Sequence, residues 1–291
     1  MDEFLHQESC SIQVFMAWTM PPSRLSLTVH HQQTLESVFH FHPNACVVVF
    51  SDTIENNFFN TFLQKGFKVA VVQPNLHELL ANTPADVFAN VWVQWWHKIP
   101  LFHLRYTDLL CLVVLYKYGG VYMDMDVIVL KPLDSLCNTV GSEILANGEV
   151  CLNGAIMAFN KSSPFLRQCL EEFTATYNDT LLEWNGAELV TRVANFSTGN
   201  GGKRWMEVPD VLQIQHPFAF FPLQSSSIFR YFVTPTDKQQ QAEEKELLTR
   251  IFDELFCHHF WSRLTAVVVP EKGSLVETIL NQHCLHCTDI L

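Results

Sequence analysis

Two aspartates separated by one residue, Asp124 and Asp126, are the residues whose types and spacing most clearly suggest chemistry. They lie in the segment YGGVYMDMDVIVL, residues 118–130, which is otherwise almost entirely apolar. If residues 121–130 form one strand, the two carboxylates project from the same face, with Cα atoms roughly 6.7 Å apart. Carboxylate oxygens are preferred ligands of Mg²⁺ and Mn²⁺, whose remaining ligands are often substrate phosphates. The pair therefore predicts a divalent metal site.

The surroundings of this pair distinguish it from two ordinary surface aspartates. Residues 103–118 are apolar nearly all round after the first turn, which predicts a central helix. Gly119-Gly120 ends that helix, because glycine accepts the left-handed conformation that follows a helix C-terminus. Uncompensated carboxylates are costly in the buried strand predicted to come next. The context therefore favours a functional role for both acids.

The elements that must position this pair follow from the hydrophobic pattern. Short, continuously apolar runs alternate with amphipathic ones, which predicts a β-α-β-α-β order with strands over 11–18, 46–50 and 67–72 and helices over 25–39 and 58–64. Strands that are apolar on both faces are typical of a parallel sheet between helices. The sequence therefore predicts an α/β fold with a doubly wound sheet.

The second half of the chain continues the pattern. A strand is predicted over 155–159, a helix that starts at Ser163-Pro164 with Ser163 as its N-cap, a flexible surface loop over 197–204, and a solvent-facing helix over 239–256. His30, His31, His40 and His42 are expected on the surface of the first helix. No repeat or long linker divides the chain, so we expect one domain.

Charge and hydropathy exclude several classes of protein. The chain has 18 Lys and Arg against 30 Asp and Glu, a net charge of −12, which is a poor match for nucleic acid. Its longest stretch without charged or strongly polar residues, 109–116, is far short of the ~20 residues of a membrane span. The acidic start does not resemble a signal peptide. As written, the chain is expected to be soluble.

The cysteines and sequons leave the redox compartment open. The chain has nine cysteines, an odd number, and three sequons begin at Asn160, Asn178 and Asn195, which favours a secretory lumen. Cys284 and Cys287 have the spacing of half a zinc site, but no second pair matches them, so a disulfide or free thiols are expected there. Trp92, Trp95 and Trp96 could stack on a sugar, but their spacing is more typical of a helix core.

The stretch Asp108 to Pro132, with its core YKYGGVYMDMDVIVLKP, resembles the D-x-D region of glycosyltransferase family 32. The resemblance is to α-1,4-glycosyltransferases similar to globotriaosylceramide synthase and their plant relatives. It extends over nearly the whole chain through shorter blocks: VFMAW (14–18), LLANTP (79–84), LNGAIMAF (152–159), WNGA (184–187), residues 218–222 and HFWS (259–262).

This resemblance implies a GT-A fold and a retaining transfer from a UDP-sugar, dependent on Mn²⁺ or Mg²⁺. The donor sugar would be a hexose of the galactose or GlcNAc type, and the acceptor a glycan or glycolipid. The single GT-A domain, residues 1–291, would bind the nucleotide sugar with residues 11–132 and the acceptor with residues 150–291. Relatives are usually anchored in the Golgi, so the chain would be a lumenal catalytic domain whose anchor is absent from this sequence.

The resemblance also implies roles for particular residues. Asp126 would bind the metal directly, Asp124 would hold the ribose and the metal shell, and His259 would be a third ligand, although the adjacent His258 leaves that choice ambiguous by one position. Asp108 would contact donor-sugar hydroxyls. The further candidates are Tyr122 for donor binding, and Asn153 and Asn185, from the two N-G-A triplets, for lining the donor and acceptor sites.

Three departures from the family pattern bear on activity. Cys111 stands where the family usually has an arginine placed to meet the diphosphate, Ser262 stands where it has an asparagine, and Ala187 stands where it has a proline. A catalytically impaired relative that acts as a binding protein is therefore an alternative. A D-x-D phosphohydrolase is a remote one, because its motif would end the first strand and would have threonine where this chain has Ile128.

Overall fold

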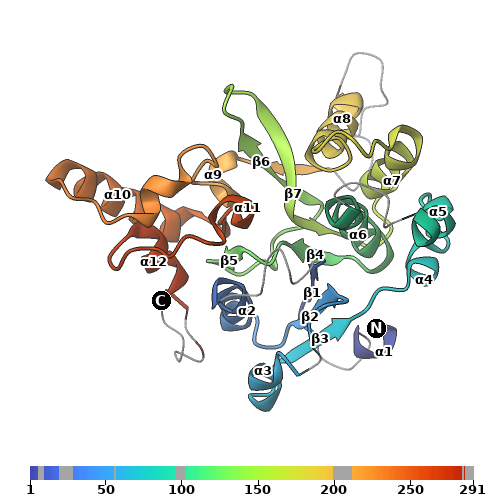
Figure 1. The fold of residues 1–291 in the computed structure, drawn as a ribbon, viewed down its shortest axis with the longest axis horizontal. Helices are drawn as coiled ribbons and strands as arrows, with labels where there is room; N and C mark the ends of the chain where they lie inside the picture. Colours follow the sequence, from blue (N-terminus) through green and yellow to red (C-terminus); the bar gives the residue numbers. More distant parts are fainter. Residues whose placement is uncertain are drawn as a thin grey trace.

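A seven-stranded, largely parallel sheet forms the centre of the molecule, in the order β3-β2-β1-β4-β7-β6-β8 (Figure 1). The computed structural model describes residues 1–5, 10–19, 29–55, 57–95, 102–198, 212–283 and 285. The strands are β1 (Gln13–Trp18), β2 (Cys46–Ser51), β3 (Lys68–Val72), β4 (Gly120–Met123), β6 (Thr139–Ile144), β7 (Val150–Phe159) and β8 (Gln213–Gln215). The first four are parallel, β7 is antiparallel to both β4 and β6, and β8 is parallel to β6.

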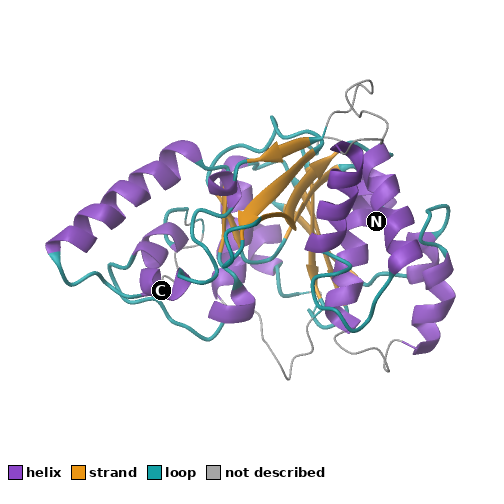
Figure 2. Ribbon diagram, turned by 90° about the horizontal axis from the view of Figure 1, so that it is seen from above, coloured by secondary structure: helices purple, strands orange, loops and turns teal. Residues whose placement is uncertain are grey.

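Helices cover both faces of this sheet (Figure 2). One face is covered by α4 (Leu76–Leu80), α5 (Val87–Trp95), α6 (Phe102–Tyr118), α7 (Pro164–Thr176) and α8 (Ala187–Thr198). The other is covered by α2 (Val29–Phe41), α3 (Asn60–Gln64) and α9 (Pro217–Phe220). A third apolar cluster joins η3 (Ile228–Phe232), α10 (Lys238–Glu254) and α12 (Leu275–Leu280). The remaining short helices are α1 (Asp2–Leu5) and α11 (Ser262–Thr265).

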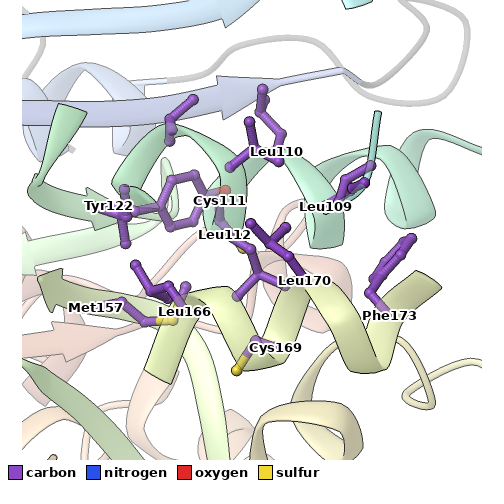
Figure 3. Packing of buried hydrophobic residues seen from close by; sticks show 14 of the residues in the cluster. Leu109, Leu110, Cys111, Leu112, Tyr122, Met157, Leu166, Cys169, Leu170 and Phe173 are labelled. Carbon is purple, nitrogen blue, oxygen red and sulfur yellow. The ribbon is translucent and has the colours of Figure 1, made fainter. Parts of the chain in front are cut away.

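The predicted central helix is confirmed as α6. Seven consecutive side chains of this helix, Leu109 to Leu115, are buried, and they meet α7 and the sheet (Figure 3). Burial of each large apolar side chain contributes about 1.5–3 kcal/mol. Gly119 and Gly120 follow with φ of +71° and +101°, and a Cβ on Gly120 would lie 2.6 Å from the carbonyl oxygen of Gln13. The middle of the helix is thus buried, and the turn that ends it is fixed against β1.

The α/β class and the first three predicted strands are confirmed, but the single strand predicted over residues 121–130 is wrong. It divides into β4 and β5 (Val127–Val129), with Asp124, Met125 and Asp126 between them. β5 leaves the main sheet and pairs antiparallel with β9 (Cys257–His259). The motif therefore lies in a turn between two sheets, because the backbone on its C-terminal side finds its hydrogen-bond partner in a distant segment.

Several smaller expectations are also decided by packing. His31 and His42 are buried, not on the surface, and Ser163 precedes α7 without a side-chain cap bond. Trp92 is fully buried, as a core residue would be. Residues 197–198 continue α8, and the rest of the predicted loop, the side chains of Trp95 and Trp96, and Cys284 and Cys287 lie outside the described residues. In the part of the chain that the structure describes, no helix is long and apolar enough to cross a membrane.

Candidate active site

The turn between β4 and β5 lies beside β9, and this places Asp124, Asp126 and His259 in one group. The pairing of β5 with β9 sets Val127 opposite His259. Asp126, the residue before Val127, is thereby brought to the histidine side chain. His259 Nε2 lies 3.3 Å from Asp126 Oδ1 and 3.9 Å from Asp124 Oδ2. One ligand atom from each of the three residues lies within 4.8 Å of the others. The two carboxylates converge through the turn and not through strand alternation.

Backbone groups after β9 hold Asp126 in place. The N–H of Phe260 donates to the carbonyl oxygen of Asp126 at 3.0 Å, and the N–H of Ser262 donates to Asp126 Oδ2 at 2.6 Å. Trp261, between them, has φ of +56°, and its indole N–H donates to the carbonyl oxygen of Leu223 at 3.0 Å. Because the contact from position 262 comes from the backbone, the serine that replaces the family asparagine does not prevent it.

The pKa values of the three side chains are shifted in different directions. Burial, with the charge of Asp126 second, raises the pKa of Asp124 to about 7. Burial would also raise the pKa of Asp126, but His259 and the N–H of Ser262 outweigh it and hold that pKa well below its usual range. Burial acts to lower the pKa of His259, and the nearby carboxylates, Asp126 first, raise it overall. Two acids and an imidazole so close together match the donor set of a divalent ion such as Mn²⁺.

The structure also separates the two neighbouring histidines. His258 faces away from the acids and lies edge-on to Phe260, with ring centroids 4.3 Å apart. Burial lowers its pKa to about 3, so it is neutral near pH 7. Only His259 is grouped with the two aspartates.

Asp108 lies outside the three-residue group, on α6. Its Oδ2 is 3.8 Å from Nη1 of Arg105, which is fully buried and also donates to the carbonyl oxygen of Leu182. A Cβ on Gly186 would lie 2.6 Å from Asp108 Oδ1, so the glycine of the second N-G-A triplet leaves room for this carboxylate. Burial raises the pKa of Asp108 to about 8, against the opposing charge of Arg105.

Tyr122 and Cys111 lie close to these acids without joining the metal group. Tyr122 is buried, and its hydroxyl donates to Asp124 Oδ1 at 3.0 Å. It therefore orients one of the predicted metal ligands. Cys111 is buried against α7 (Figure 3), its thiol donates to the carbonyl oxygen of Asp108 at 3.2 Å, and burial raises its pKa well above the usual range. The position where the family has an arginine is thus neutral.

The two asparagines of the N-G-A triplets differ. Asn153 accepts from the N–H of Ala155 at 2.8 Å and donates from Nδ2 to Glu143 Oε1 at 2.7 Å. Asn185 is fully buried, and both polar atoms of its amide are paired with the backbone of Asn178. Asn185 therefore fixes the loop before α8. Glu143 was not among the residues predicted from the sequence; the signal for it is an acid within the predominantly buried strand β6.

Two protein families, each matching one part, together match most of the chain. The family described as a glycosyltransferase sugar-binding region containing a DXD motif matches residues 28–143. The family described as an alpha 1,4-glycosyltransferase conserved region matches residues 158–291. Both descriptions agree with the resemblance inferred from the sequence, which is thereby confirmed.

Two curated relatives and one solved structure illustrate what the chain is similar to. An uncharacterised protein of Arabidopsis thaliana is 46% identical over 100% of this chain and 44% of its own length. The lactosylceramide 4-alpha-galactosyltransferase of Mus musculus is 28% identical over 79% of this chain and 62% of that protein. Among solved structures, the PaToxG glycosyltransferase is 15% identical, with a TM-score of 0.48 over 69% of this chain and 70% of that one. The chain thus spans less than two thirds of either curated relative.

Proposed function

Because the chain belongs to the family of α-1,4-glycosyltransferases with a DXD sugar-binding region, we propose that it is a metal-dependent, retaining hexosyltransferase. It would transfer a hexose from a UDP-sugar to a glycan or glycolipid acceptor. The observation that carries the proposal is the convergence of Asp124, Asp126 and His259 within 4.8 Å, from segments far apart in the sequence. Such a group has the chemistry needed to bind a divalent ion beside a diphosphate.

Asp124, Asp126 and His259 would hold the ion, which is Mn²⁺ or Mg²⁺ in this proposal. When bound, it supplies positive charge that stabilises the departing diphosphate. The protein's own groups prepare the ligands: Tyr122 donates to one carboxylate, and the N–H of Ser262 to the other. These bonds fix both carboxylates before the ion arrives, so less free energy is lost in ordering them on binding.

We propose galactose as the first donor sugar to test, since the mouse relative is named a galactosyltransferase. UDP-GlcNAc is the second donor to test. In this proposal residues 11–132 bind the nucleotide sugar, residues 150–291 form the acceptor side, and Asp108 contacts donor hydroxyls. Asn153 would act at the donor and acceptor sites through Glu143. Asn185 remains a candidate only as the residue that shapes the loop beside Asp108.

A lumenal location, in the Golgi as proposed for the family, is supported by one covalent feature. Cys10 and Cys46 form a disulfide that ties the segment before β1 to the start of β2. Disulfides persist in oxidising compartments and are rare in the cytosol.

A second candidate function rests on Cys111. This buried, neutral thiol provides no positive charge near the acids, and a missing charge-assisted hydrogen bond to a diphosphate weakens stabilisation of the leaving group. The alternative is a family member that binds UDP-sugars without turnover.

The experiment that separates the two is UDP release from UDP-galactose, UDP-GlcNAc and UDP-glucose, with and without Mn²⁺. Lactosylceramide and its free head-group sugar, lactose, serve as acceptors because the mouse relative is named for the former. We expect Mn²⁺-dependent release, an α-linked product by NMR, and loss of both in Asp126→Asn but not in the exposed-acid control Asp86→Asn. A chain that binds UDP but turns over none of the three donors would refute the transferase and leave the binding protein.

A further inference from the structure

Glu143 is a largely buried carboxylate that the predicted metal group does not use. It lies on β6 with 8% of its surface exposed. Its Oε1 accepts from Nδ2 of Asn153 at 2.7 Å and from the thiol of Cys151 at 3.7 Å. Its other oxygen, Oε2, has no hydrogen-bond partner and no Lys or Arg partner among the residues that the structure describes, yet it is not sealed from solvent. Because no protein group pairs with Oε2 and solvent reaches it, this oxygen is available to accept a hydrogen bond from a ligand.

A short chain of hydrogen bonds connects Glu143 to the metal group. The N–H of Asp124 donates to the carbonyl oxygen of Ala155 at 2.8 Å. The N–H of Ala155 donates to Asn153 Oδ1 at 2.8 Å, and Nδ2 of the same asparagine donates to Glu143. The position of the Glu143 carboxylate is therefore fixed relative to the backbone of Asp124.

Phe221 indicates that Glu143 lies on the same side of the sheet as His259, because positions 141 and 143 of β6 share one face. A Cβ on Gly141, two residues before Glu143, would lie 2.7 Å from Cε2 of Phe221. The ring of Phe221 lies 5.6 Å from that of His259. Two independent observations, the hydrogen bonds through β7 and the position of Phe221, thus connect this carboxylate to the side of the sheet that carries the metal group.

The electrostatics agree with this placement. Burial raises the pKa of Glu143, opposed by its bond from Asn153 and by the charge of His259. In turn, Glu143 is one of the carboxylates that raise the pKa of His259. The two side chains therefore act on each other across the site.

We propose that Glu143 determines sugar specificity, its free Oε2 accepting a hydrogen bond from a hydroxyl of the transferred or the acceptor sugar. This inference rests on the proposed transferase. A carboxylate is an acceptor at both oxygens and sugar hydroxyls are donors, so the two are complementary. A site built to bind a hydroxyl rejects an analogue that lacks it, because its own polar group is then left unpaired. Asn153 is a positioning residue in this arrangement.

The test compares Glu143→Gln and Glu143→Ala with Glu149→Gln, which removes the same charge from an exposed site on the same hairpin. Calorimetry in Mn²⁺ gives the affinities for UDP and for UDP-galactose, and kinetics give KM for lactose. We expect UDP affinity to stay within about twofold in both Glu143 variants. Losing a hydrogen bond to a charged group lowers affinity about tenfold to hundredfold. A loss of that size should appear either in donor binding or in the kinetics with lactose.

If the partner is the donor, the preference for UDP-galactose over UDP falls; if it is the acceptor, kcat/KM for lactose falls and donor binding is unchanged. In either case, wild type and Glu143→Ala should bind one monodeoxy form of that sugar equally well. That form lacks the hydroxyl that donates to Glu143, so the substitution has no hydrogen bond left to remove. Thermal unfolding confirms that Glu143→Gln is folded.

Three results would overturn the inference: no change in either sugar measurement, the same change in Glu149→Gln, or a loss of Mn²⁺ affinity in the Glu143 variants, which would make Glu143 a metal ligand. Failure of the proposed transferase is seen separately. A wild-type chain that prefers UDP-galactose to UDP but never transfers it would refute the activity, and the loss of that preference in Glu143→Gln would still support the sugar contact. A wild-type chain with neither the preference nor turnover would overturn both.

Discussion

Asp126 is contacted at both carboxylate oxygens and at its backbone carbonyl oxygen, and these contacts keep its side chain ionised. The Ser262 N–H holds Oδ2, His259 approaches Oδ1, and the Phe260 N–H holds the carbonyl oxygen. A carboxylate that accepts such bonds stays ionised, as the lowered pKa of Asp126 indicates. Asp124 has a raised pKa, so in the proposed metal site it is the member of the pair whose charge would depend most on the cation.

The first prediction concerns the two adjacent histidines. His259→Asn should lower Mn²⁺ affinity at least about tenfold, because it removes a predicted ligand. His258→Asn should leave Mn²⁺ affinity unchanged, since that side chain faces Phe260. Titration of each variant with Mn²⁺, followed by calorimetry, tests this. Equal losses in the two variants would show that His259 has no special part in metal binding.

At the scale of elements, the loop before α8 and helix α6 are fitted to each other around Asp108. The two N-G-A triplets look alike in the sequence, but their glycines meet different surroundings. A Cβ on Gly186 would meet Asp108 Oδ1 at 2.6 Å, whereas a Cβ on Gly154 would meet only the flexible end of Met157 at 3.7 Å. Of the two, only Gly186 is therefore required by the space around it.

The second prediction follows from that difference. Gly186→Ala should destabilise the fold by about 1–3 kcal/mol, the usual cost of overpacking, and displace Asp108. Gly154→Ala, the matched control, should change stability much less. Urea unfolding of both variants measures the difference, and UDP-galactose affinity reports the displacement. A neutral Gly186→Ala would mean that the loop moves without cost.

The third prediction concerns the end of α2, where the N–H of Leu133 donates to His42 Nε2 at 2.9 Å. Burial lowers the pKa of His42, against the charge of Asp134, so the folded protein favours the neutral ring. The contribution of the neutral His42 ring to the free energy of unfolding is fully present above the unfolded-state pKa of 6.5. It is lost as the pH falls through the lowered pKa of His42 in the folded state. His42→Gln should therefore show a smaller loss of unfolding free energy between pH 7.5 and 5 than wild type.

The control for that comparison is His77→Gln, at an exposed position in α4, which should keep the wild-type pH dependence. Parallel pH profiles for wild type and His42→Gln would contradict the assignment.

At the scale of the whole molecule, both halves of the chain build one site. β7, from the second half, extends the sheet beside β4, and β9 pairs with β5. The bond between Asp126 and Ser262 joins residues 136 positions apart. Formation of the site therefore requires most of the chain to fold.

The fourth prediction concerns the disulfide of Cys10 and Cys46, which closes a loop of 36 residues. Cys10→Ser should lower the unfolding free energy by about 2–4 kcal/mol, since the unfolded chain is no longer constrained. Dithiothreitol should lower the stability of wild type by a similar amount and leave Cys10→Ser unchanged. Sensitivity of the variant to the reductant would show that its effect on wild type does not come from this disulfide.

The sequence by itself determined the α/β class, the buried helix α6 and the D-x-D pair, because hydrophobic periodicity and the glycine pair are local features. It could not choose between His258 and His259, separate Gly186 from Gly154, or identify Glu143. Each of those choices depends on which side chain faces which, and that is set by contacts between distant segments. Only the tertiary structure decided that the acids lie in a turn, since β5 leaves the main sheet to pair with the remote strand β9.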